Sequence, residues 1–240
     1  LISSRMMEFG IYDASGYEST LPSRNWDLLR FIYLSKKPND TNLLNLLNVK
    51  YIASHDNMRT YGYKKVNKTP HATIYLNTRC LPRAMLLRKV IVIDSDEKII
   101  NYISSSEFNP KEEIILEDPA LSAWPETGSR KSGAGKDIVE IVKYMPREVE
   151  ISVAAKAEAF LQLSDTYYPG WKAYVDGKEE KIYRANYFLR AVRVPQGEHI
   201  VKFVYDPLSF KAGAAISLIT LLILILYLVV IRLRLTLPND

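Results

Sequence analysis

The chain has 240 residues, enough for one large domain or two small ones with a real hydrophobic core. Hydrophobic residues make up 48% and charged residues 25%, which excludes a globally disordered chain. Because the formal net charge of +5 is spread along the chain, we expect no nucleic-acid partner. The single cysteine, Cys80, excludes an intrachain disulfide and a cysteine-based zinc site.

Residues 1–110 predict a mixed α/β subdomain. Apolar spacing and flanking residues favour helices over 24–34, 41–48 and 95–104 and strands over 49–54, 72–77 and 85–93. Thr41 could cap the second helix. Asp96 and Glu97 lie in the first turn of the third helix, where the helix dipole favours acidic side chains.

A linker is expected over residues 111–136. Its most loop-like stretch is residues 127–136, TGSRKSGAGK, which is rich in Gly and Ser. The stretch superficially resembles a phosphate-binding loop, but Arg130 stands where that motif needs its first Gly. Asp137 stands where it needs Ser or Thr. We therefore expect no nucleotide site here.

Residues 137–206 predict an antiparallel β-sandwich. Val149, Ile151 and Val153 alternate with polar residues, which is the period of a half-buried strand. The dipeptide Asp176-Gly177 is typical of a tight hairpin turn. Strands are expected over 137–144, 147–154, 158–165, 171–175, 178–183, 187–194 and 198–205. The expected fold class is α+β: a mixed α/β part, then this sandwich, then one transmembrane helix.

The last segment, residues 207–235, contains the transmembrane helix and its flanks. Ala212 to Ile231 is an uncharged, mostly apolar run of about 20 residues, the length that spans a bilayer. It is apolar all round, which disfavours the alternative of a buried core helix with one polar face. Two arginines follow the run and only Lys211 lies directly before it. The positive-inside rule therefore predicts a cytoplasmic C-terminus.

The residues show no recognisable catalytic, metal or cofactor motif. His55, His71 and His199 have no paired spacing that would suit a metal, and no nucleophile elbow occurs. Acidic neighbours such as Glu112 and Glu113 point to opposite faces of a strand, so we interpret them as surface acids and not as a hydrolase pair.

An aromatic cluster is the strongest candidate for a binding function. It comprises Tyr167, Tyr168, Trp171 and Tyr174. Exposed rings can stack on sugars, but large rings also fill sandwich cores, and the core interpretation is favoured. Under that interpretation, Pro169 and Gly170 form a bend that begins a strand.

Residues 167–218, beginning YYPGWKAYVDGK, closely resemble the C-terminal region of the YfhO-type bacterial membrane protein family. Residues 10–18, 46–52 and 81–84 resemble other segments of that family in the same order. The resemblance implies a large membrane protein that is similar to glycosyltransferases using lipid-linked sugars. Its catalytic acid would lie in an early extracytoplasmic loop, so no catalytic residue carries over to this chain.

We therefore expect a non-catalytic extracytoplasmic C-terminal portion of such a protein, with a role in glycosylating cell-envelope polymers. The expected location is the bacterial cytoplasmic membrane, with most of the chain outside. The expected partners are the lipid bilayer, upstream helices of the same parent chain, and an envelope glycan or lipid-linked sugar. The alternative is a membrane-anchored carbohydrate-binding module, which rests on the aromatic cluster.

Overall fold

The structure is a computed structural model of the whole chain. It describes residues 23–24, 26–27, 42–55, 62–124 and 136–236. The helix expected over 24–34 and the loop expected over 127–136 therefore lie almost wholly outside the described residues.

A six-stranded sheet forms the middle layer of the body. Its strands, in order across the sheet, are β4 (Ala84–Leu87), β9 (Ala159–Thr166), β13 (Leu189–Val194), β12 (Ile182–Ala185), β6 (Glu113–Leu116) and β5 (Lys89–Val92). Neighbours pair antiparallel except β5 and β6, which run parallel. β12 and β6 are joined at a single pair, Ala185 with Leu116. The sheet therefore combines strands from both sides of residue 110.

This sheet is strongly curled. β4 and β5 form its opposite edges, yet only Arg88 separates them in the chain. Because consecutive Cα atoms lie about 3.8 Å apart, the two edges must come together at Arg88. The single strand expected over 85–93 is therefore wrong: it is two strands with a break at this residue.

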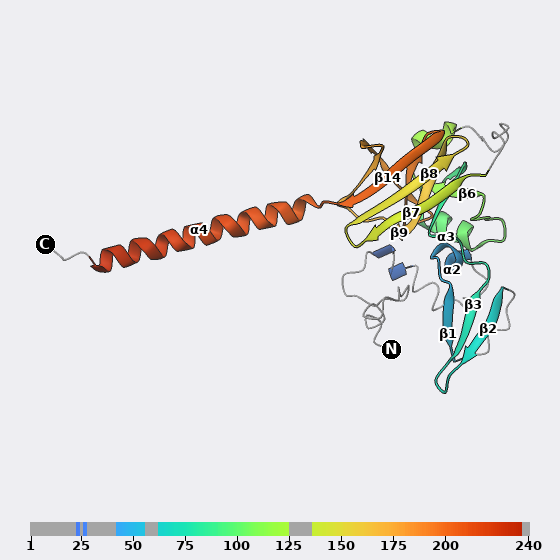
Figure 1. Cartoon of the computed structure of the whole chain (residues 1–240), viewed down its shortest axis with the longest axis horizontal. Coiled ribbons are helices and arrows are strands. Elements are labelled where there is room, and N and C mark those ends of the chain that lie inside the picture. The colour runs from blue at the N-terminus through green and yellow to red at the C-terminus, as the bar shows by residue number, and fades with distance from the viewer. Residues whose placement is uncertain (1–22, 25, 28–41, 56–61, 125–135, 237–240) are drawn as a thin grey trace.

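A five-stranded antiparallel sheet packs on one face of the six-stranded sheet. Its order is β11 (Lys178–Glu180), β10 (Trp171–Val175), β14 (Gly197–Tyr205), β8 (Glu148–Ala155) and β7 (Ile138–Met145). Figure 1 shows β14, β8 and β7 side by side. Val149, Ile151 and Val153 are buried against Leu161 and Phe203, while the residues between them face outward. The predicted antiparallel sandwich is confirmed.

The hairpin over 171–183 contains one correction. Asp176 and Gly177 both have positive φ (50° and 82°), as the predicted tight turn requires. The following strand, expected over 178–183, is instead β11 and β12, and these belong to different sheets. The chain crosses from one layer to the other at Lys181.

Helices cover the other face of the six-stranded sheet. They are α2 (Asn42–Leu46), α3 (Asp96–Ser104) and the short 3-10 helix η3 (Pro119–Ala123). Ile99 and Ile103 of α3 are buried against the sheet, with Phe160 among their neighbours in this second core. Strand β6 and η3 lie in the stretch expected to be linker. All four residues of β6 are buried, so no alternation marks it in the sequence.

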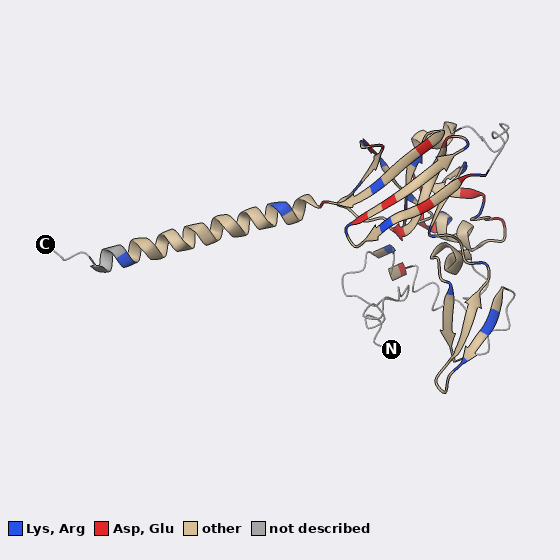
Figure 2. Cartoon of the chain, in the orientation of Figure 1, with Lys and Arg blue, Asp and Glu red and all other residues tan. Residues whose placement is uncertain are grey.

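A small three-stranded antiparallel sheet projects from the body. Its order is β1 (Tyr51–Ser54), β3 (Thr73–Asn77) and β2 (Tyr63–Lys68). Asn77 holds it to the body by donating to Asn45 Oδ1 (2.9 Å) and to the Val49 carbonyl (3.0 Å). Figure 2 shows Lys and Arg along β2. Residues 50–79 contain six Lys and Arg but only one Asp, a net charge of +5 that equals the net charge of the whole chain. The expectation that the positive charge is spread along the chain is therefore wrong.

The chain ends in the long helix α4 (Leu208–Thr236), which leaves the body on one side (Figure 1). Its segment Leu208–Arg232 has 25 residues and is long and apolar enough to cross a membrane. None of that apolar window is buried inside the protein. The helix contains the whole run from Ala212 to Ile231, so the alternative of a buried core helix is wrong.

Candidate binding site

The turn between β9 and β10 touches the base of α4. The Gly170 carbonyl accepts a hydrogen bond from the Asp206 amide (2.7 Å), two residues before the helix begins. Gly170 has φ +96°, and a Cβ there would lie 2.9 Å from the Pro207 Cβ. The turn therefore needs glycine both for its backbone conformation and for its close approach to Pro207.

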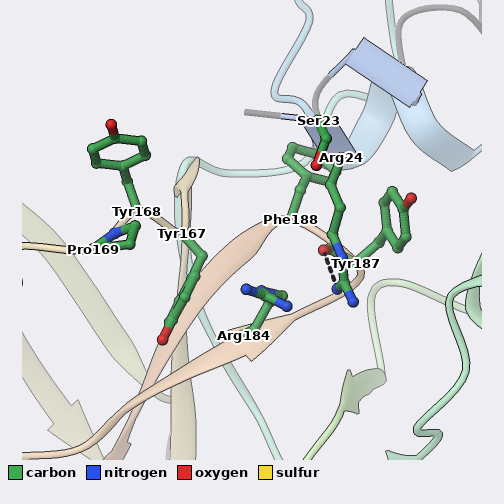
Figure 3. A pocket seen from close by; sticks show the side chains of 8 residues that line it. All are labelled: Ser23, Arg24, Tyr167, Tyr168, Pro169, Arg184, Tyr187 and Phe188. Carbon is green, nitrogen blue, oxygen red and sulfur yellow. Dashed lines mark hydrogen bonds between the residues drawn. The ribbon is translucent and has the colours of Figure 1, made fainter. Parts of the chain in front are cut away.

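A pocket of about 160 Å³ lies beside this turn (Figure 3). Its lining consists of Ser23, Arg24, Tyr167, Tyr168, Pro169, Arg184, Tyr187 and Phe188. The Tyr167 amide donates to the Phe188 carbonyl (2.6 Å), which joins the turn to the segment between β12 and β13. Figure 3 shows that the guanidinium groups of Arg24 and Arg184 and the rings around them come from three separate stretches of the chain.

The charges of the pocket are largely compensated. Arg24 pairs with Asp96 and Glu117, and it also donates to the Tyr187 carbonyl (3.0 Å). Arg184 lies 3.4 Å from a Glu117 oxygen. The pocket wall therefore offers both donors and acceptors of hydrogen bonds, and it does not present an excess of positive charge.

The Tyr187 hydroxyl is a neutral hydrogen-bond donor. Burial raises the pKa of Tyr187, and the nearby carboxylates of Asp27 and Asp96 raise it further. The Arg24 guanidinium lies over the Tyr187 ring, 4.8 Å from its centroid, and Arg184 lies over Tyr167 at 4.7 Å. These stacked pairs fix the ring positions around the cavity.

The structure separates the four aromatic residues of the predicted cluster. Tyr167 and Tyr168 line the pocket. Trp171 faces inward between the sheets and packs against the sandwich core, as the core interpretation expects. Tyr174 lies on the opposite side of β10, because Ala173 and Val175 beside it are buried. The four rings therefore form no joint platform, and Tyr174 is not among the described residues that line the pocket.

A buried charged cluster lies behind Trp171. The Asp165 carboxylate accepts from Arg83 (2.8 Å), Arg190 (2.6 Å) and the Tyr144 hydroxyl (2.9 Å). The side chains of Arg190 and Asp165 are only 3% and 9% exposed. Burial, together with the Asp165 charge, raises the pKa of Tyr144 to about 12.

Arg190 is stacked between aromatic rings. Its guanidinium carbon lies 3.8 Å from the Trp171 centroid and 5.3 Å from that of Phe203, and its Nε and Nη1 have no hydrogen-bond partner. Ring faces attract such a cation, which compensates in part for the missing hydrogen bonds. The sequence analysis missed this cluster. The available indication was an arginine at an inward position of the apolar strand LRAVRV.

One histidine and one acid considered in the sequence analysis make specific contacts in the structure. His199 Nδ1 contacts Asp176 Oδ2 (2.6 Å) at the β10–β11 turn, so this pair is structural. Glu113, expected at the surface, is buried and pairs with Lys89 (2.8 Å). Among the residues that the structure describes, no three His, Cys, Asp or Glu side chains are grouped to hold a metal ion.

Comparison with known proteins identifies the family. Residues 104–217 match the family model of the bacterial membrane protein YfhO. The chain belongs to the YfhO family. The match begins before β6 and covers every later strand of the two large sheets, the pocket turn and the first turns of α4. Strands β4 and β5 lie outside it.

A YfhO relative is far longer than this chain. The uncharacterized protein YfhO of Bacillus subtilis (strain 168) is 32% identical over 66 residues, which are 28% of this chain and 8% of that protein. The relative is thus several times longer. No solved structure matches this YfhO-family chain.

Proposed function

We propose that this YfhO-family chain is the non-catalytic extracytoplasmic C-terminal portion of a glycosyltransferase-like membrane protein. In this proposal its pocket binds one sugar ring, carried by a lipid-linked sugar or by an envelope glycan. The observation that carries the proposal is the position of an aromatic and hydrogen-bonding pocket on a turn that touches the base of the membrane helix.

The composition of the pocket suits a sugar. Tyr167 and Tyr168 supply ring faces for stacking, while the guanidinium groups of Arg24 and Arg184 and the tyrosine hydroxyls supply donors and acceptors for sugar hydroxyl groups. Its volume of about 160 Å³ lies below the roughly 300–1,000 Å³ of sites for drug-sized ligands. A single ring is therefore a better fit than an oligosaccharide.

The remaining partners follow from α4 and from the size of the relative. The helix exposes apolar side chains on every side, so it can contact both lipid and neighbouring helices. The parent chain in this proposal supplies those helices upstream, and the enzyme that acts on the sugar would lie there. The excess of arginine after the apolar run supports a cytoplasmic C-terminus and an extracytoplasmic body.

The alternative function is a free-standing membrane-anchored carbohydrate-binding module. The exposure of Tyr168, 45%, favours it, because an exposed ring next to the pocket could contact a glycan that comes from outside. The reading frame upstream of Leu1 separates the two proposals. A run of hydrophobic helices there supports the first, and its absence supports the second.

Sugar binding is tested with the full chain in lipid nanodiscs. Saturation-transfer NMR against a panel of hexoses and N-acetylhexosamines should detect binding to the wild type. Tyr167→Ala should weaken it about fivefold, since an aromatic contact contributes roughly 1 kcal/mol. Tyr174→Ala is the matched control. It also truncates a tyrosine to alanine, but at a position on β10 that does not line the pocket, so it should leave binding unchanged. Equal loss in both variants, or no binding by the folded wild type, contradicts the proposal.

A further inference from the structure

The turn that carries the pocket lies against the base of α4. We propose that residues 167–170 lie in the headgroup layer of the bilayer that α4 crosses, so that the body docks on the lipid surface through this turn. The partner of this surface is the bilayer itself, and the proposal does not depend on what the pocket binds.

The first argument is that the turn is fixed to the helix base. The Gly170 carbonyl accepts from the Asp206 amide, and Gly170 packs on Pro207. Asp206 in turn pairs with Lys211 of α4 (2.7 Å). The turn therefore cannot move far from the start of the helix without breaking these contacts.

The second argument is length. The uncharged run between Lys211 and Arg232 has 20 residues and is about 30 Å long at 1.5 Å per residue, which equals the hydrocarbon thickness of a typical bilayer. Lys211 then lies at the edge of the hydrocarbon. Pro207 stands four residues earlier, about 6 Å further out along the helix direction. Each headgroup layer is about 5–7 Å thick, so Pro207 and the neighbouring turn fall within it.

The third argument is side-chain chemistry. The Tyr168 ring contacts Tyr205 (centroids 6.4 Å apart), and Tyr205 packs on the inward-facing Trp171 (5.4 Å), so the three rings form an aromatic group next to the helix base in which Tyr168 is the exposed member. Tyrosine and tryptophan favour the membrane–water interface, where an apolar ring and a polar tip are both satisfied. Lys172 and Lys211 lie beside the group, both within 3.8 Å of Asp206, and their long side chains can reach phosphate groups.

The other end of the five-stranded sheet lacks these features. There, the turns at Asp176-Gly177 and Pro195-Gln196 carry exposed polar and charged residues and no Tyr, Trp or Phe. β10 and β14 both run between the two ends, so one end is suited to lipid headgroups and the other to water. The docked orientation places Tyr167, Tyr168 and the pocket beside the headgroups, where a ligand attached to a lipid would arrive.

The test uses the full chain in nanodiscs with a single fluorescent label. Pro169→Cys in a Cys80→Ser background labels the turn, and Gln196→Cys in the same background labels the far end as the matched control. Lipids with a nitroxide on the headgroup should quench the label at Pro169 at least threefold more strongly than the label at Gln196. Lys172→Cys gives a second position near the turn if the Pro169 substitution perturbs it. Equal quenching at the near and far positions overturns the proposal.

Discussion

At the scale of single residues, the body depends on charges held between its sheets. Asp165 is nearly buried and neutralises two guanidinium groups at once, Arg83 and Arg190. Replacing it leaves the buried Arg190 guanidinium without the carboxylate that neutralises it, and an uncompensated buried charge is strongly destabilising. An acid at the surface, such as Glu158 beside Arg193, is screened by water and should matter little.

Asp165→Asn should therefore lower the free energy of unfolding by about 3–5 kcal/mol, whereas Glu158→Gln should lower it by about 1 kcal/mol or less. The pair is matched, since each variant converts an acid into its amide next to an arginine. Thermal unfolding of the extramembrane body, followed by tryptophan fluorescence in nanodiscs, measures both. Similar losses in the two variants would contradict the assigned role of Asp165.

Asp137 gives a prediction about pH. It accepts two hydrogen bonds from Arg88 (2.7 and 2.8 Å) and one from the Lys156 amide (2.9 Å). The Arg88 bonds, only partly opposed by burial, hold the pKa of this carboxyl below its ordinary value of about 3.9. Its stabilising contribution is therefore complete above that value and is lost as pH falls through the lower pKa of the folded state.

Asp137→Asn should thus be less stable than the wild type at pH 7, and the difference should shrink below about pH 4. Melting temperatures at pH 7, 4 and 3 give the comparison, with Glu140→Gln on the exposed face of β7 as the control. A difference that stays constant over this pH range would show that the ionised carboxylate is not its source.

At the scale of elements, the sequence predicts what depends on local pattern. The alternation in β8, the turn at Asp176-Gly177 and the apolar helix α4 are confirmed. Each depends on residues that are close together in the sequence: one buried face of a strand, a dipeptide that accepts positive φ, and an apolar run long enough to span a bilayer. The break at Arg88 was not predictable, since it arises only when β4 and β5 pair with different partners far along the chain.

The same division holds for the candidate site. The sequence identified Tyr167 and Tyr168, but the pocket also needs Arg24 and Arg184, which only the tertiary fold brings to them. Strand parity could have separated Trp171 from Tyr174, because a spacing of three positions places two side chains on opposite faces of a strand. The Arg190 cluster was missed because a lone arginine in an apolar strand does not reveal its partner.

The helix α4 gives the prediction that belongs to this scale. Ile223→Arg places a charge near the middle of the apolar run and should reduce insertion by roughly 2.5–3.5 kcal/mol on the translocon scale. Ile223→Leu is the control and should insert normally. Extraction of membranes with alkaline carbonate reports the inserted fraction, and an unchanged fraction for the arginine variant would contradict the assignment of α4 as a membrane span.

At the scale of the whole molecule, charge and apolarity lie in different places. α4 is apolar throughout its span, the turn at its base is aromatic, and the surplus of positive charge belongs to the projecting sheet of β1, β3 and β2 (Figure 2). Lysines on β2, an edge strand of that sheet, also oppose pairing with a second chain. The arrangement suits a body that is held at a membrane by one end and kept soluble at the other.

The central claim is that α4 crosses the membrane and holds this body on the outer side. Two single-cysteine variants in the Cys80→Ser background test it most directly: Gln196→Cys in the body and Asn239→Cys after the helix. With a membrane-impermeant maleimide, intact spheroplasts should show labelling at Gln196, whereas Asn239 should react only after the membrane is permeabilised. Labelling of Asn239 but not Gln196 in intact spheroplasts, or release of the chain from membranes by carbonate, would contradict the account.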